Sequence, residues 1–117
     1  MAIKLISGEN QRKTNDTPVH SLVNFKSNDT SNNMPLAVNS GLVEAGSESV
    51  IESHESVEMW VVVRGNGVVC SDGVDYDANA GDVFYFDALV EHKVKNMSNK
   101  SMLITSVWCK GDKLDDD

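Results

Sequence analysis

Three side chains capable of acid–base or metal chemistry stand close together near the middle of the chain: Glu52, His54 and Glu58. They are separated by even steps, and even steps along an extended strand place side chains on one face. Two carboxylates and an imidazole would then point the same way, and His92 could join them from a second strand. Carboxylate and neutral imidazole suit a divalent transition metal, so these residues predict a metal site.

The composition is that of one ordinary folded domain. The chain has 117 residues, of which 40% are hydrophobic and 24% charged, enough for a modest core. The formal net charge of −8 repels nucleic acid and anionic membranes, so we expect neither as a partner. No apolar run approaches the roughly 18 residues of a membrane span, and the N-terminus lacks a signal-peptide pattern. We therefore expect a cytoplasmic protein.

The two cysteines, Cys70 and Cys109, form no paired motif. In a cytoplasmic protein, reduced and half-buried thiols are the default. A disulfide or a thiolate metal ligand is the alternative.

Short apolar runs separated by turn residues fill the chain after Met34. Turn signals such as Asp72-Gly73 and Ala80-Gly81-Asp82 recur at the spacing of about 8 to 12 residues that is typical of a β-sandwich or barrel. No stretch shows helical periodicity over three turns. The pattern therefore predicts an all-β fold.

The predicted organisation has three parts. Residues 1–33 form an N-terminal arm with edge strands, 34–110 form the barrel, and 111–117 form a flexible acidic tail. The apolar patches 3–6 and 22–25 are each expected to be an edge strand or an arm on a partner subunit. The expected barrel strands are 35–43 with a break near Ser40-Gly41, 50–56, 57–63, 68–70, 74–77, 83–86, 92–96 and 102–109, with a turn at 65–67.

The spacing of these residues resembles the two sequence motifs of the cupin family. The first motif runs from a glycine through two metal-binding positions and a glutamate to a second glycine. At the family spacing, these positions hold Gly46, Glu52, His54, Glu58 and Gly65. One residue type departs from the pattern, because Glu52 stands where the family usually has its first histidine.

The second motif is also present at the family spacing, with Gly81, His92 and Asn96 at its marked positions. Its Pro-x-Gly turn is replaced by Asp87-Ala88-Leu89. The resemblance implies a jelly-roll β-barrel or sandwich with an irregular N-terminal arm. The glycines and Asn96 carry over as structural markers.

The resemblance also implies one divalent ion, Fe, Mn, Ni, Co or Zn, bound by His54, Glu58 and His92. Glu52 carries over only by position: it is either a fourth ligand or a catalytic general base off the metal. Cupins include oxygenases, isomerases, lyases and binding proteins, and a fold does not settle function. We expect a metal-dependent enzyme acting on a small polar metabolite. The alternative is a non-catalytic small-molecule-binding or accessory cupin with a degenerate metal site.

The strand around Glu58 predicts what else faces the barrel interior. If Glu58 points inward, so do the next alternate residues, while Met59 and its alternates point outward. Both faces are apolar, so a second subunit is the simplest cover, and we expect a homodimer. The substrate-binding candidates are Trp60, Phe84, Tyr85 and Arg64, of which Arg64 could pair with a substrate carboxylate. Each of the four could equally be an ordinary core aromatic or an exposed charge.

Overall fold

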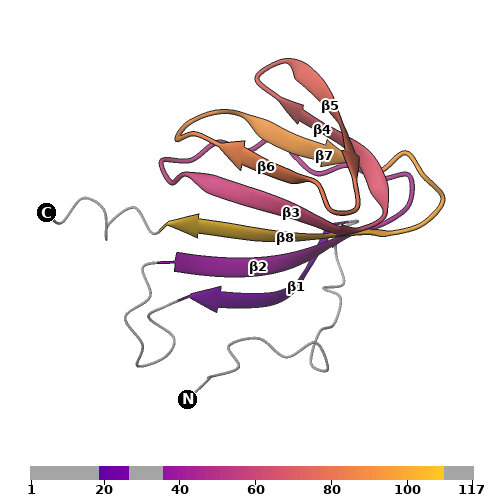
Figure 1. The fold of residues 1–117 in the computed structure, drawn as a ribbon, viewed down its shortest axis with the longest axis horizontal. Helices are drawn as coiled ribbons and strands as arrows, with labels where there is room; N and C mark the ends of the chain where they lie inside the picture. The colour runs from indigo at the N-terminus through magenta and orange to yellow at the C-terminus, as the bar shows by residue number, and fades with distance from the viewer. Residues whose placement is uncertain (1–18, 27–35, 110–117) are drawn as a thin grey trace, which may run out of the picture.

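The computed structural model describes residues 19–26 as a strand and residues 36–109 in full. These residues form eight strands (Figure 1) and no helix that is long and apolar enough to cross a membrane. The strands are β1 (Val19–Lys26), β2 (Leu36–Val43), β3 (Glu58–Arg64), β4 (Asn66–Ser71), β5 (Val74–Asn79), β6 (Val83–Phe86), β7 (His92–Lys95) and β8 (Met102–Cys109).

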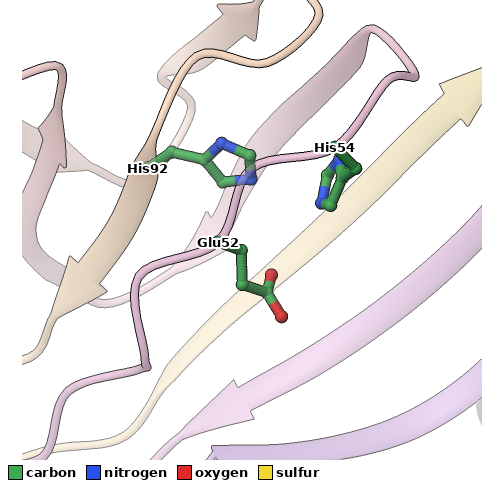
Figure 2. A group of neighbouring side chains, drawn as sticks. All are labelled: Glu52, His54 and His92. Carbon is green, nitrogen blue, oxygen red and sulfur yellow. The ribbon is translucent and has the colours of Figure 1, made fainter.

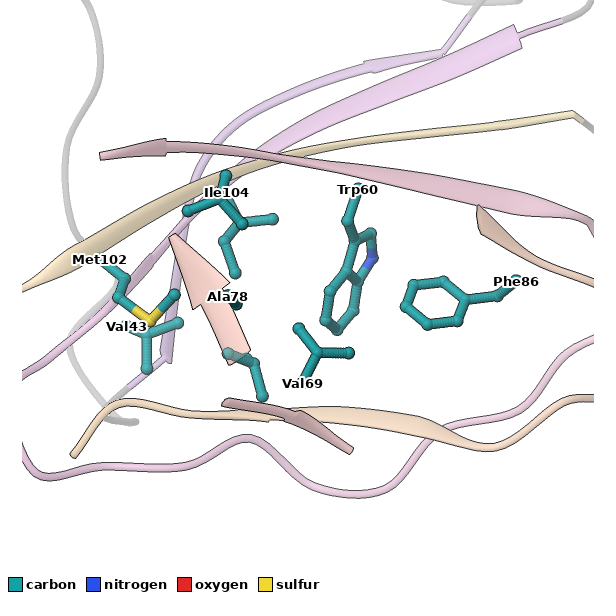
Figure 3. Packing of buried hydrophobic residues seen from close by; sticks show 9 residues of the cluster. Val43, Trp60, Val69, Ala78, Phe86, Met102 and Ile104 are labelled. Carbon is teal, nitrogen blue, oxygen red and sulfur yellow. The ribbon is translucent and has the colours of Figure 1, made fainter. Parts of the chain in front are cut away.

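The strands make two antiparallel sheets that enclose one apolar core. The larger sheet has the order β1-β2-β8-β3-β6, and the smaller has the order β5-β4-β7. Alternation along each strand sends one set of side chains into the space between the sheets (Figure 3). The core residues are Val43, Trp60, Val62, Val69, Ala78, Phe86, Val94, Met102 and Ile104. The predicted all-β fold is confirmed.

Most of the predicted strands are present with small shifts of their ends. The bounds of β6 and β8 agree with the prediction, and the patch 22–25 lies in β1, an edge strand paired with β2. The predicted break in 35–43 is wrong, since β2 continues through Ser40-Gly41. The irregularity lies instead in β1, where the register with β2 shifts between Ser21 and Val23. The patch 3–6 and the tail 111–117 lie outside the described residues.

The predicted three-residue turn after β3 is shorter than expected. Only Gly65 separates β3 from β4, and its φ of 88° lies in the left-handed region that favours glycine. A Cβ on Gly65 would also meet the carbonyl oxygen of Ser101 at 2.9 Å and Cα of Met102 at 3.0 Å. This glycine therefore satisfies two constraints at once, a backbone conformation and a close approach between chain segments.

Asn96 has a physical role that explains its place in the second motif. Its side chain is buried, and its amide nitrogen donates to the carbonyl oxygens of Val43 and Lys100. Its amide oxygen accepts hydrogen bonds from the backbone N–H and the hydroxyl of Ser98. Asn96 thus fixes the turn between β7 and β8 and ties it to the end of β2.

Comparing Gly65→Ala with Gly81→Ala separates the two constraints on Gly65. Gly81 also has a positive φ, of 95°, but a Cβ there would meet nothing within 4 Å. We expect Gly81→Ala to lower the free energy of unfolding by roughly 1–2 kcal/mol from backbone strain alone. Gly65→Ala should cost about 1–3 kcal/mol more, because neighbouring backbone has to move. Equal losses of unfolding free energy in the two variants, measured by urea unfolding, would show that the close approach at Gly65 does not affect stability.

Candidate metal centre

The loop that brings Glu52 and His54 to the site is irregular. The predicted strand 50–56 is wrong, because only two isolated β-bridges, Glu48 with Lys95 and Glu52 with His92, occur in this part of the chain. Backbone hydrogen bonds in both directions join Glu52 and His92, at 3.0 and 2.9 Å. The loop therefore runs beside β7, and this pairing, rather than strand alternation, brings Glu52 close to His92.

Glu52, His54 and His92 lie together, as predicted. Each offers one ligand atom, and these atoms all lie within 4.8 Å of one another (Figure 2). His92 is buried at the start of β7, whereas Glu52 and His54 are exposed. The group combines one fixed histidine with two side chains on a loop.

Glu58 contacts both histidines from the start of β3. Its Oε1 lies 3.4 Å from Nε2 of His54 and 3.2 Å from Nε2 of His92. Glu58 and His92 are both buried, at 8% and 2% exposure. The prediction that Glu58 faces inward is confirmed, and so is the inward direction of the alternate residues Trp60 and Val62.

The contact between Glu58 and His92 leaves two buried atoms without a hydrogen bond. Nδ1 of His92 lies 2.9 Å from the carbonyl oxygen of Val90, which can only accept, so Nδ1 carries the proton. In the neutral imidazole, Nε2 is then an unprotonated acceptor facing the carboxylate of Glu58. Among the described residues, neither Nε2 nor Oε1 has a hydrogen-bond partner. Two acceptors in this position need a cation between them, either a proton or a metal ion.

Aromatic side chains hold this pair in position. The indole N–H of Trp60 donates to Oε2 of Glu58 at 2.8 Å, which leaves Oε1 directed at the histidines. The ring of Phe86 stacks on His92 at 4.4 Å, and Trp60 meets both rings edge-on. Trp60 therefore has a hydrogen-bonding role that its prediction as a substrate-binding candidate missed. The signal in the sequence was its position two residues after Glu58, on the same face.

The protonation equilibria of the pair follow from these contacts. Burial alone would raise the pKa of Glu58, but the contacts with His92 and Trp60 and the nearby histidine charges outweigh it, so the pKa is lowered. Burial alone would lower the pKa of His92, but Glu58, the Val90 carbonyl and Glu52 outweigh it, so the pKa is raised. The site thus favours a carboxylate together with a positive charge near His92.

The residues present fit a divalent metal ion. When two ligand atoms each lie about 2.1 Å from one ion, their distance from each other depends on the angle at the ion. It is about 3.0 Å at a right angle and about 3.4 Å at a tetrahedral angle. The 3.2 and 3.4 Å contacts of Glu58 match this spacing. Glu52, on the exposed loop, has its ligand atom within 4.8 Å of those of both histidines. The hydrogen bond of His92 to Val90 is the usual outer support of a metal-bound histidine.

The departure from the second motif leaves a strained turn beside the loop. Leu89 occupies the position of the family's turn glycine, and its φ is 68°. Its backbone N–H donates to the carbonyl oxygen of His54 at 2.7 Å, and the N–H of Val90 donates to the carbonyl of Asp87. The turn thus keeps its glycine-like conformation without glycine, at a cost of order 1–3 kcal/mol, and it supports the loop at His54.

The structure does not bring every predicted substrate-binding residue to the cluster. Phe84 is half-buried and packs against the core, with Tyr76 edge-on at 6.2 Å. Tyr85 is 62% exposed on the opposite face of β6, where its hydroxyl donates to Asp87. Arg64 is exposed at the other end of β3 from Glu58, six residues or about 20 Å away. Of the four candidates, Trp60 alone contacts the cluster in the structure.

The cysteines take no part in this group. Cys70 and Cys109 are both free and half-buried, as expected, and neither belongs to the group of possible ligands in the described residues. Burial, together with the neighbouring Asp75, raises the pKa of the Cys70 thiol.

Comparison with known proteins agrees with the fold and the motifs. The family model described as "Cupin domain" matches residues 41–108, more than half of the chain. The chain belongs to the cupin family. Cupins commonly bind a metal, and the Glu/His/His group is where this cupin could do so.

Solved structures share the architecture over most of the chain. A Cupin 2 conserved barrel domain protein from Salinispora arenicola is 25% identical, with a TM-score of 0.74, over 98% of this chain and 93% of that one. A protein from Photorhabdus luminescens is 18% identical, with a TM-score of 0.77, over 97% and 92%. A predicted oxalate decarboxylase from Thermotoga maritima is 22% identical, with a TM-score of 0.66, over 78% and 77%.

Replacing Trp60 tests the support that it gives to Glu58. Trp60→Phe keeps an aromatic ring in the core but removes the N–H that orients the carboxylate. We expect metal affinity to fall about 10-fold or more, the usual effect of losing such an outer partner. Tyr76→Phe is the control, since it also removes the polar group of an aromatic side chain but lies on β5, outside the cluster. Equal Co²⁺ affinities in the two variants, measured by calorimetry, would remove Trp60 from the account.

Proposed function

We propose that this cupin is a metal-dependent enzyme that acts on a small polar metabolite at one His/Glu metal centre inside the barrel. The ion is a divalent Fe, Mn, Ni, Co or Zn. The observation that carries the proposal is the buried lone pair of His92 Nε2 aimed at the Glu58 carboxylate, with no partner for either atom. Such an arrangement is costly in an apolar core unless a cation completes it.

Two residues of the proposed centre are buried and held in place, and two are accessible. His92 and Glu58 are buried and fixed by Val90, Trp60 and Phe86. His54 and Glu52 lie on the exposed loop, on the side that a substrate can reach. An ion bound here would act as a Lewis acid or as an oxygen-activating centre.

Glu52 is the residue we assign to proton transfer. Its backbone pairs with His92, which keeps its side chain beside the ligand atoms, yet the side chain is exposed. A carboxylate in this position can take a proton from a substrate bound next to the ion. The same geometry also allows Glu52 to be a fourth ligand, which would leave this cupin without that base.

A non-catalytic small-molecule-binding or accessory role is the second candidate. It is favoured by the placement of Glu52 and His54 on an irregular loop instead of a strand, because catalytic groups need tightly held geometry. In that case the metal site is degenerate, and ligand binding proceeds without turnover.

Metal content of the purified protein tests the proposal. We expect about one transition-metal ion per chain in the wild type and almost none in His92→Ala, by elemental analysis after expression without a tag that binds metal. His20→Ala is the matched control, because it removes the chain's remaining histidine, which pairs with Leu42 across β1 and β2. Equal metal in wild type and His92→Ala would remove His92 from the ligand set.

The same measurement on Glu52→Gln distinguishes its two roles. Full metal content with lost proton-transfer activity identifies a base, whereas loss of the ion identifies a ligand.

We also propose that the protein is a homodimer that buries the outer face of β3 and β6. Met59, Val63, Val83 and Tyr85 are 39%, 49%, 56% and 62% exposed there. Met59 pairs with Tyr85, and Val61 pairs with Val83, so these side chains form one continuous apolar patch. A patch of this kind is typical of a surface that a partner covers.

A charge placed in this patch should separate the subunits. We expect Met59→Lys to convert a dimer to a monomer in sedimentation equilibrium at micromolar concentration, because a buried lysine without a partner is costly. Val74→Lys, on the exposed edge strand β5, should leave the dimer intact. A monomeric wild type would contradict the proposal.

A further inference from the structure

The four positive charges of residues 36–109 lie away from the metal centre. They are Arg64, Lys93, Lys95 and Lys100. Arg64 is at the far end of β3. Lys93 binds Glu48 at 3.0 Å on the outer face of β7, and Lys95 shares that face because the alternate residues His92 and Val94 are buried. Lys100 lies in the turn after β7, beyond the end opposite His92.

Negative charges, by contrast, lie next to the cluster along the chain. Glu55 follows His54 directly in the exposed loop. Asp87 follows Phe86, the ring that stacks on His92. Both are exposed, so they add a negative rim to the two carboxylates of the centre itself.

The position beside Glu58 where a cation could hold an anionic ligand is occupied by an aromatic ring. On the inner face of the larger sheet, the register partners of Glu58 are Trp108 on β8 and Phe86 on β6. Partners across antiparallel strands have side chains about 5 Å apart on one face. Trp108 is half-buried, so part of its side chain remains accessible.

From this charge distribution we infer that the ligand of the centre is uncharged or cationic, and that carboxylates and phosphates are selected against. This inference rests on the proposed metal centre. A divalent ion with the two carboxylates of Glu52 and Glu58 has no net charge left to attract an anion. Carboxylates and phosphates are otherwise recognised by arginine or lysine, and residues 36–109 place neither beside the cluster. Hydroxyl and carbonyl oxygens remain as the groups that can bind the ion.

The test uses the Co²⁺-loaded protein, with azide as an anionic probe and imidazole as a neutral one, each followed by the visible spectrum of Co²⁺. In the wild type, we expect azide to bind more tightly as ionic strength is raised with perchlorate, because screening weakens a repulsion. Imidazole binding should stay constant. Azide affinity that falls with ionic strength would overturn the inference, since it would show an attractive site.

Removing two rim charges gives the second measurement. In Glu55→Gln/Asp87→Asn, azide affinity at low salt should rise about three- to fivefold, because two repelling charges are removed. The control Asp75→Asn/Asp77→Asn removes two charges from β5 and should leave it unchanged. An unchanged azide affinity in the rim variant overturns the inference while the metal centre stands. Failure of Co²⁺ to bind at all overturns both.

Discussion

The contact between Glu58 and His92 is the constraint on which the rest of the site depends. Two buried acceptors face each other at 3.2 Å inside an apolar core, and each has its second polar atom already bonded elsewhere. The Val90 carbonyl fixes the histidine tautomer, and the Trp60 indole fixes the free carboxylate oxygen. The protein thus prepares a place for a positive charge between Nε2 of His92 and Oε1 of Glu58.

The fold supplies this contact by bringing β3 and β7 from different sheets to one end of the barrel. Gly65 lets β3 turn directly into the smaller sheet, and Asn96 fixes the end of β7 against β2. The loop before β3 then needs no regular structure of its own, because its hydrogen bonds to β7 hold it in place. The resulting cluster is buried at Glu58 and His92 and exposed at Glu52 and His54.

The sequence predicts the parts of this arrangement that depend on local periodicity and motif spacing. Alternation along β3 correctly places Glu58 and Trp60 inward, and the motif spacing correctly brings Glu52 and His54 to His92. Alternation fails for residues 50–56, because their pairing is with β7 and is set by the tertiary fold. It also gives no warning that Leu89 adopts a positive φ, since the surrounding backbone imposes it. Once β3 is known to be one continuous strand, the rise per residue is enough to place Arg64 far from the site.

The most direct test of the account is a crystal structure of the purified protein with anomalous diffraction recorded on both sides of the transition-metal absorption edges. We expect one ion bound by Nε2 of His54, Nε2 of His92 and Oε1 of Glu58, with at least one coordination position open. The position of Glu52 in that structure would distinguish a ligand from a base. A site without an ion, in which Glu52 and His54 diverge from His92, would contradict the assignment of a metal centre.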